Sequence, residues 1–391
     1  MYQSVTTRYF HERVLFYLSS LAWAFGHGLI NIFIPIYLWN LGIALYVIFL
    51  FFACTQVVRT LAVPLAVKLT TRIGAKHVIS ISFVFKILFL ILFSQNLSPA
   101  IFWLSAGAYG FFAAFIDVGY HLHLSKIISD GQRGQMLAHE NIARMMPLAL
   151  APIVGGYLLS SMGISVTLLV SITFYILASL LLLRSPEISY RHTLNLHLLK
   201  MGSVWRDEAA NGFYNAHLHL EMVAWPLFIY LIVNGYEKVG FIAAIGLLAG
   251  FVIYIWEGRI LDHADRKKLF MRISAVHMGF SLLRLLARGF ASLAVFNSSY
   301  EATARARSLA WTSILQSNIV RHPHAEYILW VEMVGALFSA LFLFIFALVA
   351  VYLENTSVIL AALLASSVII VFSNMVKYKN STLPVRVLKS S

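Results

Sequence analysis

Long apolar segments alternate with short polar ones along the chain. A helix needs about 20 apolar residues to cross the hydrocarbon core of a bilayer, and twelve segments approach or exceed that length. The ninth and tenth are the weakest of them because they contain charged residues, among them Arg284 and Glu301. The predicted spans cover residues 14–39, 43–66, 77–95, 99–125, 136–160, 164–183, 209–234, 239–257, 269–287, 290–317, 326–352 and 356–376.

The composition agrees with this pattern. The chain has 391 residues, of which 60% are apolar and only 12% are charged, and its mean hydropathy is +0.81. Soluble domains contain about 25% charged residues, and a soluble core of this size could not bury so much apolar surface. We therefore predict an all-α membrane protein with twelve transmembrane helices and no separate soluble domain. The nucleotide-binding pattern GxxxxGK(S/T) is missing, so ATP-driven transport by this chain is not expected.

The basic residues between the predicted spans are concentrated on one side. The loops of that side, the connection at 185–208 and both tails each carry Lys or Arg, whereas the other side receives only Lys238 and Arg288. Basic loops stay in the cytoplasm, so we expect a multi-pass protein of the cell (inner) membrane with both termini cytoplasmic. This distribution also accounts for the net charge of +13 without a nucleic-acid partner.

The N-terminal segment and the single cysteine do not change this interpretation. Arg8 and Arg13 resemble the basic flank of a signal peptide, but the apolar stretch from Val14 to about Trp39 is too long for one. We expect it to be retained as the first span. Cys54 is the only cysteine, so no disulfide can form within the chain.

The two halves of the chain repeat each other at an offset of about 191 residues. Pro35 in the first span corresponds to Pro226 in the seventh, and the polar loop 67–76 corresponds to the loop 258–267. Glu140 and Glu332 lie at an offset of 192. An even number of spans per half gives both halves the same orientation. We therefore expect two parallel six-helix bundles, 1–184 and 209–391, joined by a cytoplasmic loop at 185–208.

Two loop motifs give the chain a resemblance to the major facilitator superfamily, and the resemblance covers essentially all of it. That family carries GxLaDRxGRK after the second span and a weaker copy after the eighth. Here the second copy is the better one, while the first has Val67 for the Gly and Thr71 for the Asp. The resemblance implies a cytoplasmic latch that closes one state of the transporter, and we group Glu140 and Glu332 with it. The matching residues are Leu69, Arg72, Gly74 and Lys76 in the first loop and Gly258, Ile260, Asp262, Arg266 and Lys267 in the second.

The fifth span carries a second motif of this family. Its sequence Ala151-Pro-Ile-Val-Gly-Gly156 is similar to the GPxxGG core found in the family's exporters. Pro152 removes a backbone hydrogen bond, and Gly155 and Gly156 permit close packing. With Pro35 and Pro226, these residues are candidate helix-bending positions, and they favour export over uptake only weakly. The alternative is ordinary small-residue packing.

Ionisable residues within the spans are the candidate site residues, because such residues are costly in a membrane and tend to face a cavity or a partner. Arg59, Asp117 and Arg144 lie at similar depth, about 12–16 Å from the cytoplasmic end of their spans at 1.5 Å per residue. The resemblance implies that these spans line a central cavity. We expect an aspartate between two arginines, with a purely structural ion pair as the alternative.

The C-terminal half and the first span supply further candidates. His217 and Glu221 share a helix face and His219 points away from them, a geometry that argues against a metal site. Packing histidines remain the alternative for His217 and His219. His121, His123, His322 and His324 are expected to be solvated residues at the rim. The remaining cavity candidates are His27, Glu301 and Arg305, with Glu301 and Arg305 on one helix face and Arg307 on another.

These observations predict a secondary active transporter that moves a small solute by alternating access. We expect coupling to protons through Asp117 and through Glu221 or Glu301, with Arg59, Arg144 and Arg305 as counter-ions or anion-binding groups. A membrane receptor or scaffold that kept the fold without transport is the alternative. No Ser/His/Asp or metal-ligand spacing indicates an enzyme. We expect no cofactor and no metal, lipid and a small solute as partners, and function as a monomer.

Overall fold

The computed structural model describes residues 2–95, 98–127, 133–185, 194–195, 197–263 and 265–377. Only the backbone path is described for residues 2–13, 126–127, 133–143 and 254–263. The predicted residues Glu140, Gly258, Ile260 and Asp262 therefore have side chains outside the described part.

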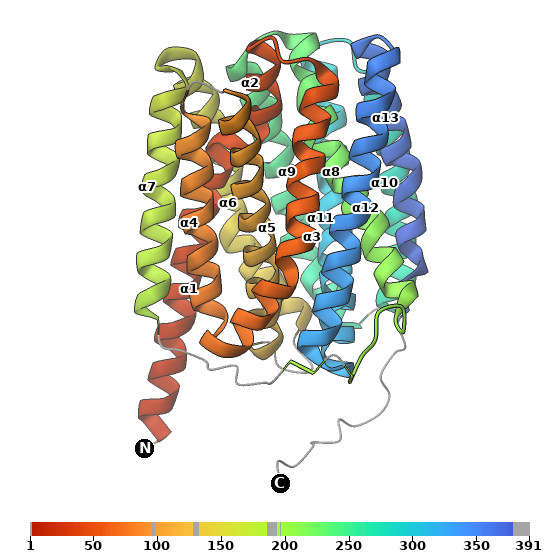
Figure 1. Ribbon diagram of the computed structural model, residues 1–391. Coiled ribbons are helices and arrows are strands. Elements are labelled where there is room, and N and C mark those ends of the chain that lie inside the picture. Colours follow the sequence, from red (N-terminus) through yellow and green to blue (C-terminus); the bar gives the residue numbers. More distant parts are fainter. Residues whose placement is uncertain are drawn as a thin grey trace.

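The described residues form twelve long helical segments (Figure 1), and their ends agree with the predicted spans to within a few residues in most cases. The first six are α1 (Tyr2–Ile30) with η1 (Asn31–Phe33) and α2 (Ile34–Asn40), α3 (Leu45–Ile73), α4 (Ala75–Phe93), α5 (Pro99–Ile127), α6 (Arg133–Ser161) and α7 (Gly163–Arg184). The others are α8 (Trp205–Val233), α9 (Tyr236–His263), α10 (Arg266–Leu283) with η2 (Arg284–Leu286), α11 (Phe290–Arg321), α12 (His324–Tyr352), and α13 (Asn355–Ile369) with η3 (Ile370–Met375).

Ten of these segments are long and apolar enough to cross a membrane, and the chain is an integral multi-pass membrane protein. Of the two segments expected to be weakest, the ninth (Arg266–Leu286) qualifies although it contains Arg284, because its other residues are apolar enough. The segments that do not qualify among the described residues are α6 and α11. Both carry several ionisable residues over their length, including Arg144 in α6 and Glu301 and Arg305 in α11.

The seventh segment begins earlier than its apolar pattern predicts. Helix α8 starts at Trp205, so the last residues of the expected connection 185–208 are already helical. The first turn contains Arg206, Asp207 and Glu208. These charged residues lower the local hydropathy, so an apolar pattern places the start of the helix too late. Acidic residues are favourable there because they interact with the positive end of the helix dipole.

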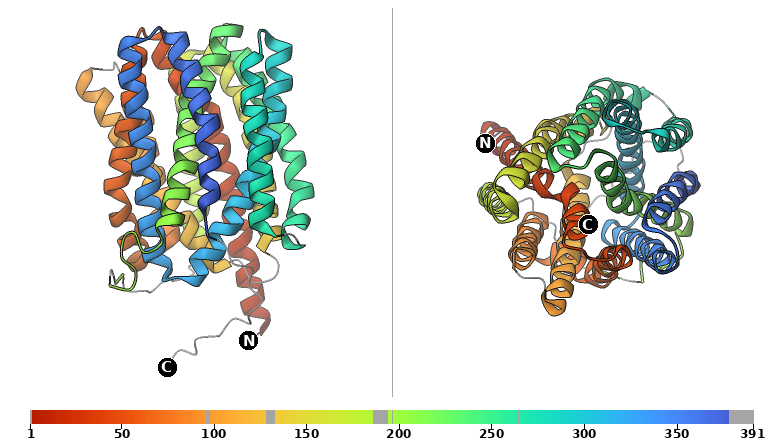
Figure 2. Two further views of the ribbon diagram at one scale, coloured as in Figure 1. Left: turned by 90° about the vertical axis from the view of Figure 1, so that its right-hand side faces the viewer. Right: turned by 90° about the horizontal axis from the view of Figure 1, so that it is seen from above.

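The helices run side by side along one common direction and surround a central region (Figure 2). Between the first and second halves of the sequence, the two closest packings are α6 against α9 and α3 against α12. Within the first half, α1 packs against α6 and α7, and α5 packs against α3 and α4. Within the second half, α8 packs against α12 and α13, and α11 packs against α9 and α10.

We call the end of the molecule where α3 meets α4 the basic end, because the basic residues of the helix junctions gather there. Helix α1 begins at this end (Figure 1). Gly74 joins α3 to α4 with φ 91°, a conformation that favours glycine. Lys76 donates from Nζ to the carbonyl of Ser185 at 2.8 Å. The basic residues at this end include Arg72, Lys76, Arg184, Lys200, Arg206, Arg266, Lys267, Lys268 and Arg321.

The second loop motif lies at the start of α10. Arg266 donates to the hydroxyl of Ser317 at 2.9 Å, from α10 to α11. The carboxylate of Asp265 caps α10 by accepting from the backbone amides of Lys267 and Lys268 at 3.1 and 3.2 Å. Glu332, which we grouped with the latch from sequence, does not lie in this region. It is buried about two turns into α12, because that helix already starts at His324.

At the opposite end, the two halves meet through close contacts. Asn40, the last residue of α2, donates to the hydroxyls of Tyr230 and Tyr236 at 2.9 and 2.8 Å. The Phe33 ring lies 5.9 Å from that of Tyr236. The turn η1 ends at Phe33, two residues before Pro35, which has no backbone N–H with which to continue the hydrogen bonding of α1. The regular α-helical hydrogen bonding of this segment is therefore interrupted close to Pro35.

Glycines in α6 and α9 make this contact possible. A side chain on Gly240 would collide with the carbonyl oxygen of Pro152, and one on Gly156 would meet the backbone of Tyr236. Gly155 packs in the same way on the backbone of Leu29 in α1. Helix α6 continues through Pro152, and α8 continues through Pro226. In the structure, Gly155 and Gly156 thus serve close helix packing.

Candidate functional site

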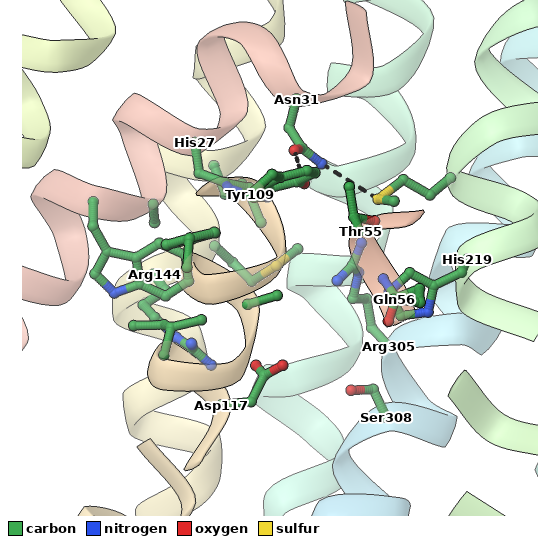
Figure 3. Close-up of a pocket in the computed structure, with 18 residues that line it drawn as sticks. His27, Asn31, Thr55, Gln56, Tyr109, Asp117, Arg144, His219, Arg305 and Ser308 are labelled. Carbon is green, nitrogen blue, oxygen red and sulfur yellow. Dashed lines mark hydrogen bonds between the residues drawn. The ribbon is translucent and has the colours of Figure 1, made fainter. Parts of the chain in front are cut away.

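A central cavity lies between the two halves at mid-depth and has two adjoining sections. The section nearer the N-terminal half has a volume of about 360 Å³ and is lined from α1, α3, α5, α6, α8 and α11 (Figure 3). The section nearer the C-terminal half has a volume of about 390 Å³. His27, Asn31, Met222 and Arg305 line both sections.

Arg59 lies at the centre of a charged cluster beside the first section. Its Nη2 atom is 2.9 Å from Asp117 on α5 and 2.6 Å from Glu332 on α12. The side chains of Arg59 and Glu332 are almost completely buried, whereas that of Asp117 is 40% exposed and lines the cavity. One guanidinium thus holds a carboxylate from each half of the sequence.

Two neighbours extend this cluster. His121 lies 3.9 Å from Glu332, and Gln316 on α11 contacts His121 at 3.3 Å. His123 is buried and stacks on Phe16 with 4.4 Å between the ring centres. The expectation that His121 and His123 are solvated rim residues is therefore wrong, because α1 and α12 contact this part of α5.

Arg144 and His27 line the first section from the other side (Figure 3). The guanidinium of Arg144 lies over the rings of Trp23 and Tyr120, at 5.7 and 4.9 Å. His27 contacts the hydroxyl of Tyr175 at 3.3 Å. Arg59 and Arg144 thus both belong to the surroundings of Asp117, and Arg59 forms an ion pair with it.

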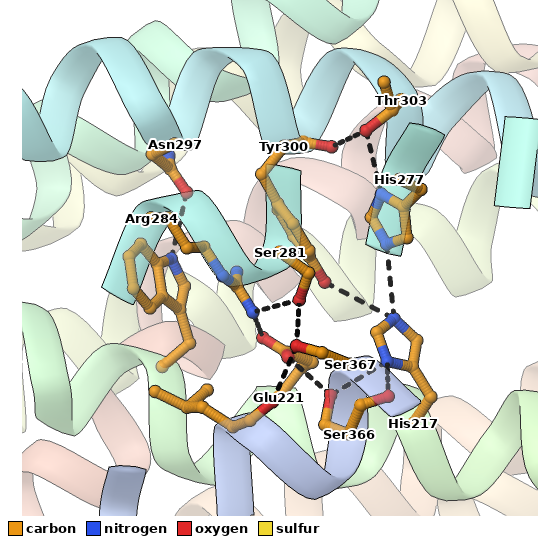
Figure 4. A network of polar contacts seen from close by, with 12 residues as sticks. His217, Glu221, His277, Ser281, Arg284, Asn297, Tyr300, Thr303, Ser366 and Ser367 are labelled. Atoms are coloured by element: carbon orange, nitrogen blue, oxygen red, sulfur yellow. Dashed lines mark hydrogen bonds and ion pairs between the residues drawn. The ribbon is translucent and has the colours of Figure 1, made fainter. Parts of the chain in front are cut away.

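A second charged cluster lies at the wall of the C-terminal section, which Glu221 lines, and Figure 4 shows its contacts. Glu221 on α8 forms an ion pair with Arg284, whose side chain is fully buried. Ser366 on α13 donates to the other carboxylate oxygen of Glu221 at 2.5 Å. The guanidinium of Arg284 also lies over the rings of Trp225 and Tyr300, at 4.1 and 3.6 Å.

Histidines continue this network to α10 and α11 (Figure 4). His217 Nδ1 contacts the hydroxyl of Ser366 at 2.8 Å, and its Nε2 lies 3.4 Å from Nε2 of His277. His277 contacts the hydroxyl of Thr303 at 2.8 Å. A chain of polar side chains therefore connects Glu221 with α11. His219 lies on another side of α8 and contacts Ser339 at 3.1 Å.

Helix α11 places three charged residues near the cavity, and they lie in two different environments. Arg305 and Glu301 form an ion pair at 2.7 Å along one helix face, next to the cavity. Arg307 is buried, lies over the Tyr214 ring at 4.5 Å, and donates to the hydroxyl of Ser373 at 3.1 Å. It lines the C-terminal section together with Tyr214 and His217.

Two buried cations, Arg284 and Lys86, were not among the site residues predicted from the sequence. Arg284 was noted only as a charge that weakens the ninth span, yet it is the partner of Glu221. Lys86 on α4 is fully buried and lies over the rings of Tyr109 and Phe89, at 4.2 and 4.7 Å. The available signal was the same for both, namely a basic residue within an apolar span.

A family model shows where this arrangement belongs. The model of the Major Facilitator Superfamily matches residues 16–304, about three quarters of the chain and parts of both halves. The chain belongs to the major facilitator superfamily. Members of this superfamily are transporters, and this chain is accordingly a transporter of the superfamily. A comparison with curated protein sequences gives no significant match.

Solved structures of superfamily transporters have the same fold. The human organic anion transporter MFSD10 (TETRAN) superposes with a TM-score of 0.69 at 14% identity, over 94% of this chain and 99% of that chain. The transporter FucP in an outward conformation gives a TM-score of 0.68 at 12% identity, over 94% and 98%. A variant of the E. coli fucose:proton symporter FucP gives 0.66 at 12% identity, over the same shares. At these identities the similarity concerns the fold alone.

Proposed function

We propose that the protein is a secondary active transporter that moves a small solute by alternating access and couples this movement to protons. The observation that carries the proposal is the central cavity. It lies between the two halves and is lined by both, with the charged residues Asp117, Arg144, Glu221 and Arg305 in its walls. Buried ionisable residues at such depth in a membrane protein typically mark a pathway for solutes or ions.

In this proposal, residues 1–184 and 209–391 form two six-helix bundles related as parallel repeats. Equivalent contacts support this division. A side chain on Gly110 would meet Thr55, and one on Gly246 would meet Glu301. Positions 246 and 301 correspond to positions 55 and 110 at the offset of 191, so the two contacts join equivalent positions of the two halves. The same offset relates α3 packed on α12 to α9 packed on α6.

We propose that the basic end lies in the cytoplasm of the cell. The two halves touch at the opposite end, so in our proposal this conformation is an inward-facing state. The basic residues at the basic end favour this orientation. The contacts of Asn40 with Tyr230 and Tyr236, and of Gly240 with Pro152, close the opposite end. Transport then requires these contacts to open while the basic end closes.

Asp117 is the proposed proton-coupling residue. Burial favours the neutral form of a carboxyl group, and a neighbouring guanidinium favours its ionised form. Arg59 holds Asp117 and also Glu332 of the other half. A relative movement of the halves would change this contact and with it the protonation of Asp117. One protonation state would then favour each orientation of the cavity.

Further features of the proposal come from the sequence. Ala151-Pro-Ile-Val-Gly-Gly156 favours export over uptake weakly, and we propose a functional monomer with lipid and a small solute as its partners. The second candidate function is a receptor or scaffold without transport. It is favoured by the incomplete first loop motif, with Val67 and Thr71 at the positions of the family's Gly and Asp.

Spin-label distances test the proposal without knowledge of the solute. In a Cys54→Ser background, one cysteine pair replaces the exposed residues Leu41 and Glu237 and another replaces Arg72 and Arg321. Alternating access predicts that acid and alkaline pH shift the two distance distributions in opposite directions, and that Asp117→Asn removes this response. A receptor predicts a single, pH-independent distribution for both pairs.

A further inference from the structure

We propose that the C-terminal section of the cavity binds an organic anion, and that Arg307 pairs with its anionic group. This assignment deepens the proposed transport function by naming the class of solute. It rests on the proposed function only for the movement of that solute across the membrane, because binding is measured separately.

Arg307 is a buried charge that has no counter-ion among the described residues. Its side chain is 2% exposed and lines the cavity section. Its polar contact is with the hydroxyl of Ser373, and its Nε atom has no hydrogen-bond partner. A guanidinium remains protonated in proteins, and a buried charge is costly unless it is paired. Among the described residues no carboxylate forms an ion pair with Arg307, so a bound anion would supply the missing charge.

The carboxylates of the cavity are already paired, which disfavours a cationic solute. Asp117 pairs with Arg59, Glu221 with Arg284, and Glu301 with Arg305. In the described part of the chain, these three acidic residues are those that line either section. An amine would have to displace an arginine from one of these pairs, whereas a carboxylate finds Arg307 without a partner.

The remaining wall indicates what the anionic group is attached to. Aromatic rings of Tyr214, Trp225 and Tyr300 face the section, together with Ile229 and Leu247. A volume of about 390 Å³ lies within the range of sites for small organic ligands, roughly 300–1,000 Å³. The solute class is therefore an amphipathic organic anion with an aromatic or aliphatic body and one anionic group.

A ligand panel tests this assignment on the purified full-length protein. The probes are phenylacetate, 2-naphthylacetate and octanoate, each with its neutral amide and the corresponding primary amine, at millimolar concentration. A ligand that binds the native state raises the melting temperature. We expect the carboxylates to raise it and the amides and amines to leave it unchanged. Equal stabilisation by the amines, or no stabilisation by any carboxylate, would overturn the assignment.

Variants then locate the binding site. We expect Arg307→Gln to weaken carboxylate binding about tenfold or more, because a hydrogen bond to a charged group is lost, and Arg307→Lys to retain part of the affinity. Arg288→Gln is the matched control, since it removes one positive charge from an exposed position outside the cavity. Undiminished binding by Arg307→Gln contradicts the role of Arg307. If Arg307→Gln does not fold, Arg307→Lys and the wild-type panel still decide the question.

The panel and the spin-label experiment can fail independently. Carboxylate binding with pH-independent distances would support the anion site and reject alternating access. Reciprocal distance changes without any preference for carboxylates would support transport and reject the anion site.

Discussion

Arg59 on α3 and Glu332 on α12 form a buried ion pair at 2.6 Å although they lie 273 residues apart in the sequence. The same nitrogen of Arg59 contacts Asp117 on α5 at 2.9 Å. Arg59 therefore keeps a partner when either carboxylate is removed, and the contact joins the first and second halves of the chain. The stability of this cluster should depend on the two carboxylates together.

The first prediction concerns this shared partner. Asp117→Asn and Glu332→Gln should each yield a folded protein, because Arg59 retains one carboxylate. The double variant leaves Arg59 buried without an anion. We expect it to lose about 0.5–3 kcal/mol more free energy of unfolding than the sum of the single variants. Denaturant unfolding of the detergent-solubilised proteins measures this difference, and strictly additive losses would contradict it.

The second prediction contrasts two ion pairs of the C-terminal half. Glu221→Gln leaves the fully buried Arg284 without a carboxylate and should lower the free energy of unfolding by about 3–5 kcal/mol. Glu301→Gln breaks the pair with Arg305, whose side chain is 27% exposed, and should cost about 1 kcal/mol or less. Melting temperatures of the two variants provide the comparison. Similar losses for both would show that burial does not govern the difference.

These pairs also show what a sequence can reveal. Glu301 and Arg305 are four residues apart on one helix, so helical geometry alone placed them on one face. The partner of Glu221 is Arg284, 63 residues away on a different helix, and no local pattern connects the two. The twelve helical segments could be predicted because hydropathy reports burial in lipid directly. Contacts between helices depend on packing, which the pattern of one sequence does not contain.

Glu332 illustrates the same difference. Its position near the start of a predicted span, and its correspondence with Glu140, led us to group it with the cytoplasmic latch. In the structure it lies deep enough in α12 to reach Arg59 on α3. Its depth could have been read from the helix start at His324. The identity of its partner, Arg59, could not be read from the sequence, because this contact depends on how closely α3 packs against α12.

The third prediction concerns the closed end of the cavity. Gly240→Ala places a methyl group where the carbonyl oxygen of Pro152 lies, so α9 and α6 cannot approach as closely as they do here. We expect this variant to favour opening at that end. Faster labelling of a cysteine at Asn31, in a Cys54→Ser background, by a membrane-impermeant maleimide added from that side would show it.

Gly107→Ala is the matched control for this experiment. A Cβ atom at Gly107 has open space around it, so we expect unchanged labelling and a slightly more stable helix, by about 1 kcal/mol or less. If both alanine variants label at the wild-type rate, the contact between Gly240 and Pro152 does not control access.

The fourth prediction concerns Lys86, which is fully buried and whose Nζ atom has no hydrogen-bond partner in the described structure. Its contacts with the rings of Tyr109, Phe89 and Phe112 offset only part of the cost of removing an ammonium group from water. Methionine has a similar length and is compatible with aromatic surroundings. Lys86→Met should therefore raise the free energy of unfolding, on the order of 1–4 kcal/mol. Lys86→Gln is the control, because it removes the charge but keeps a polar group, and it should stabilise less. A lower melting temperature for Lys86→Met than for the wild type would contradict this account.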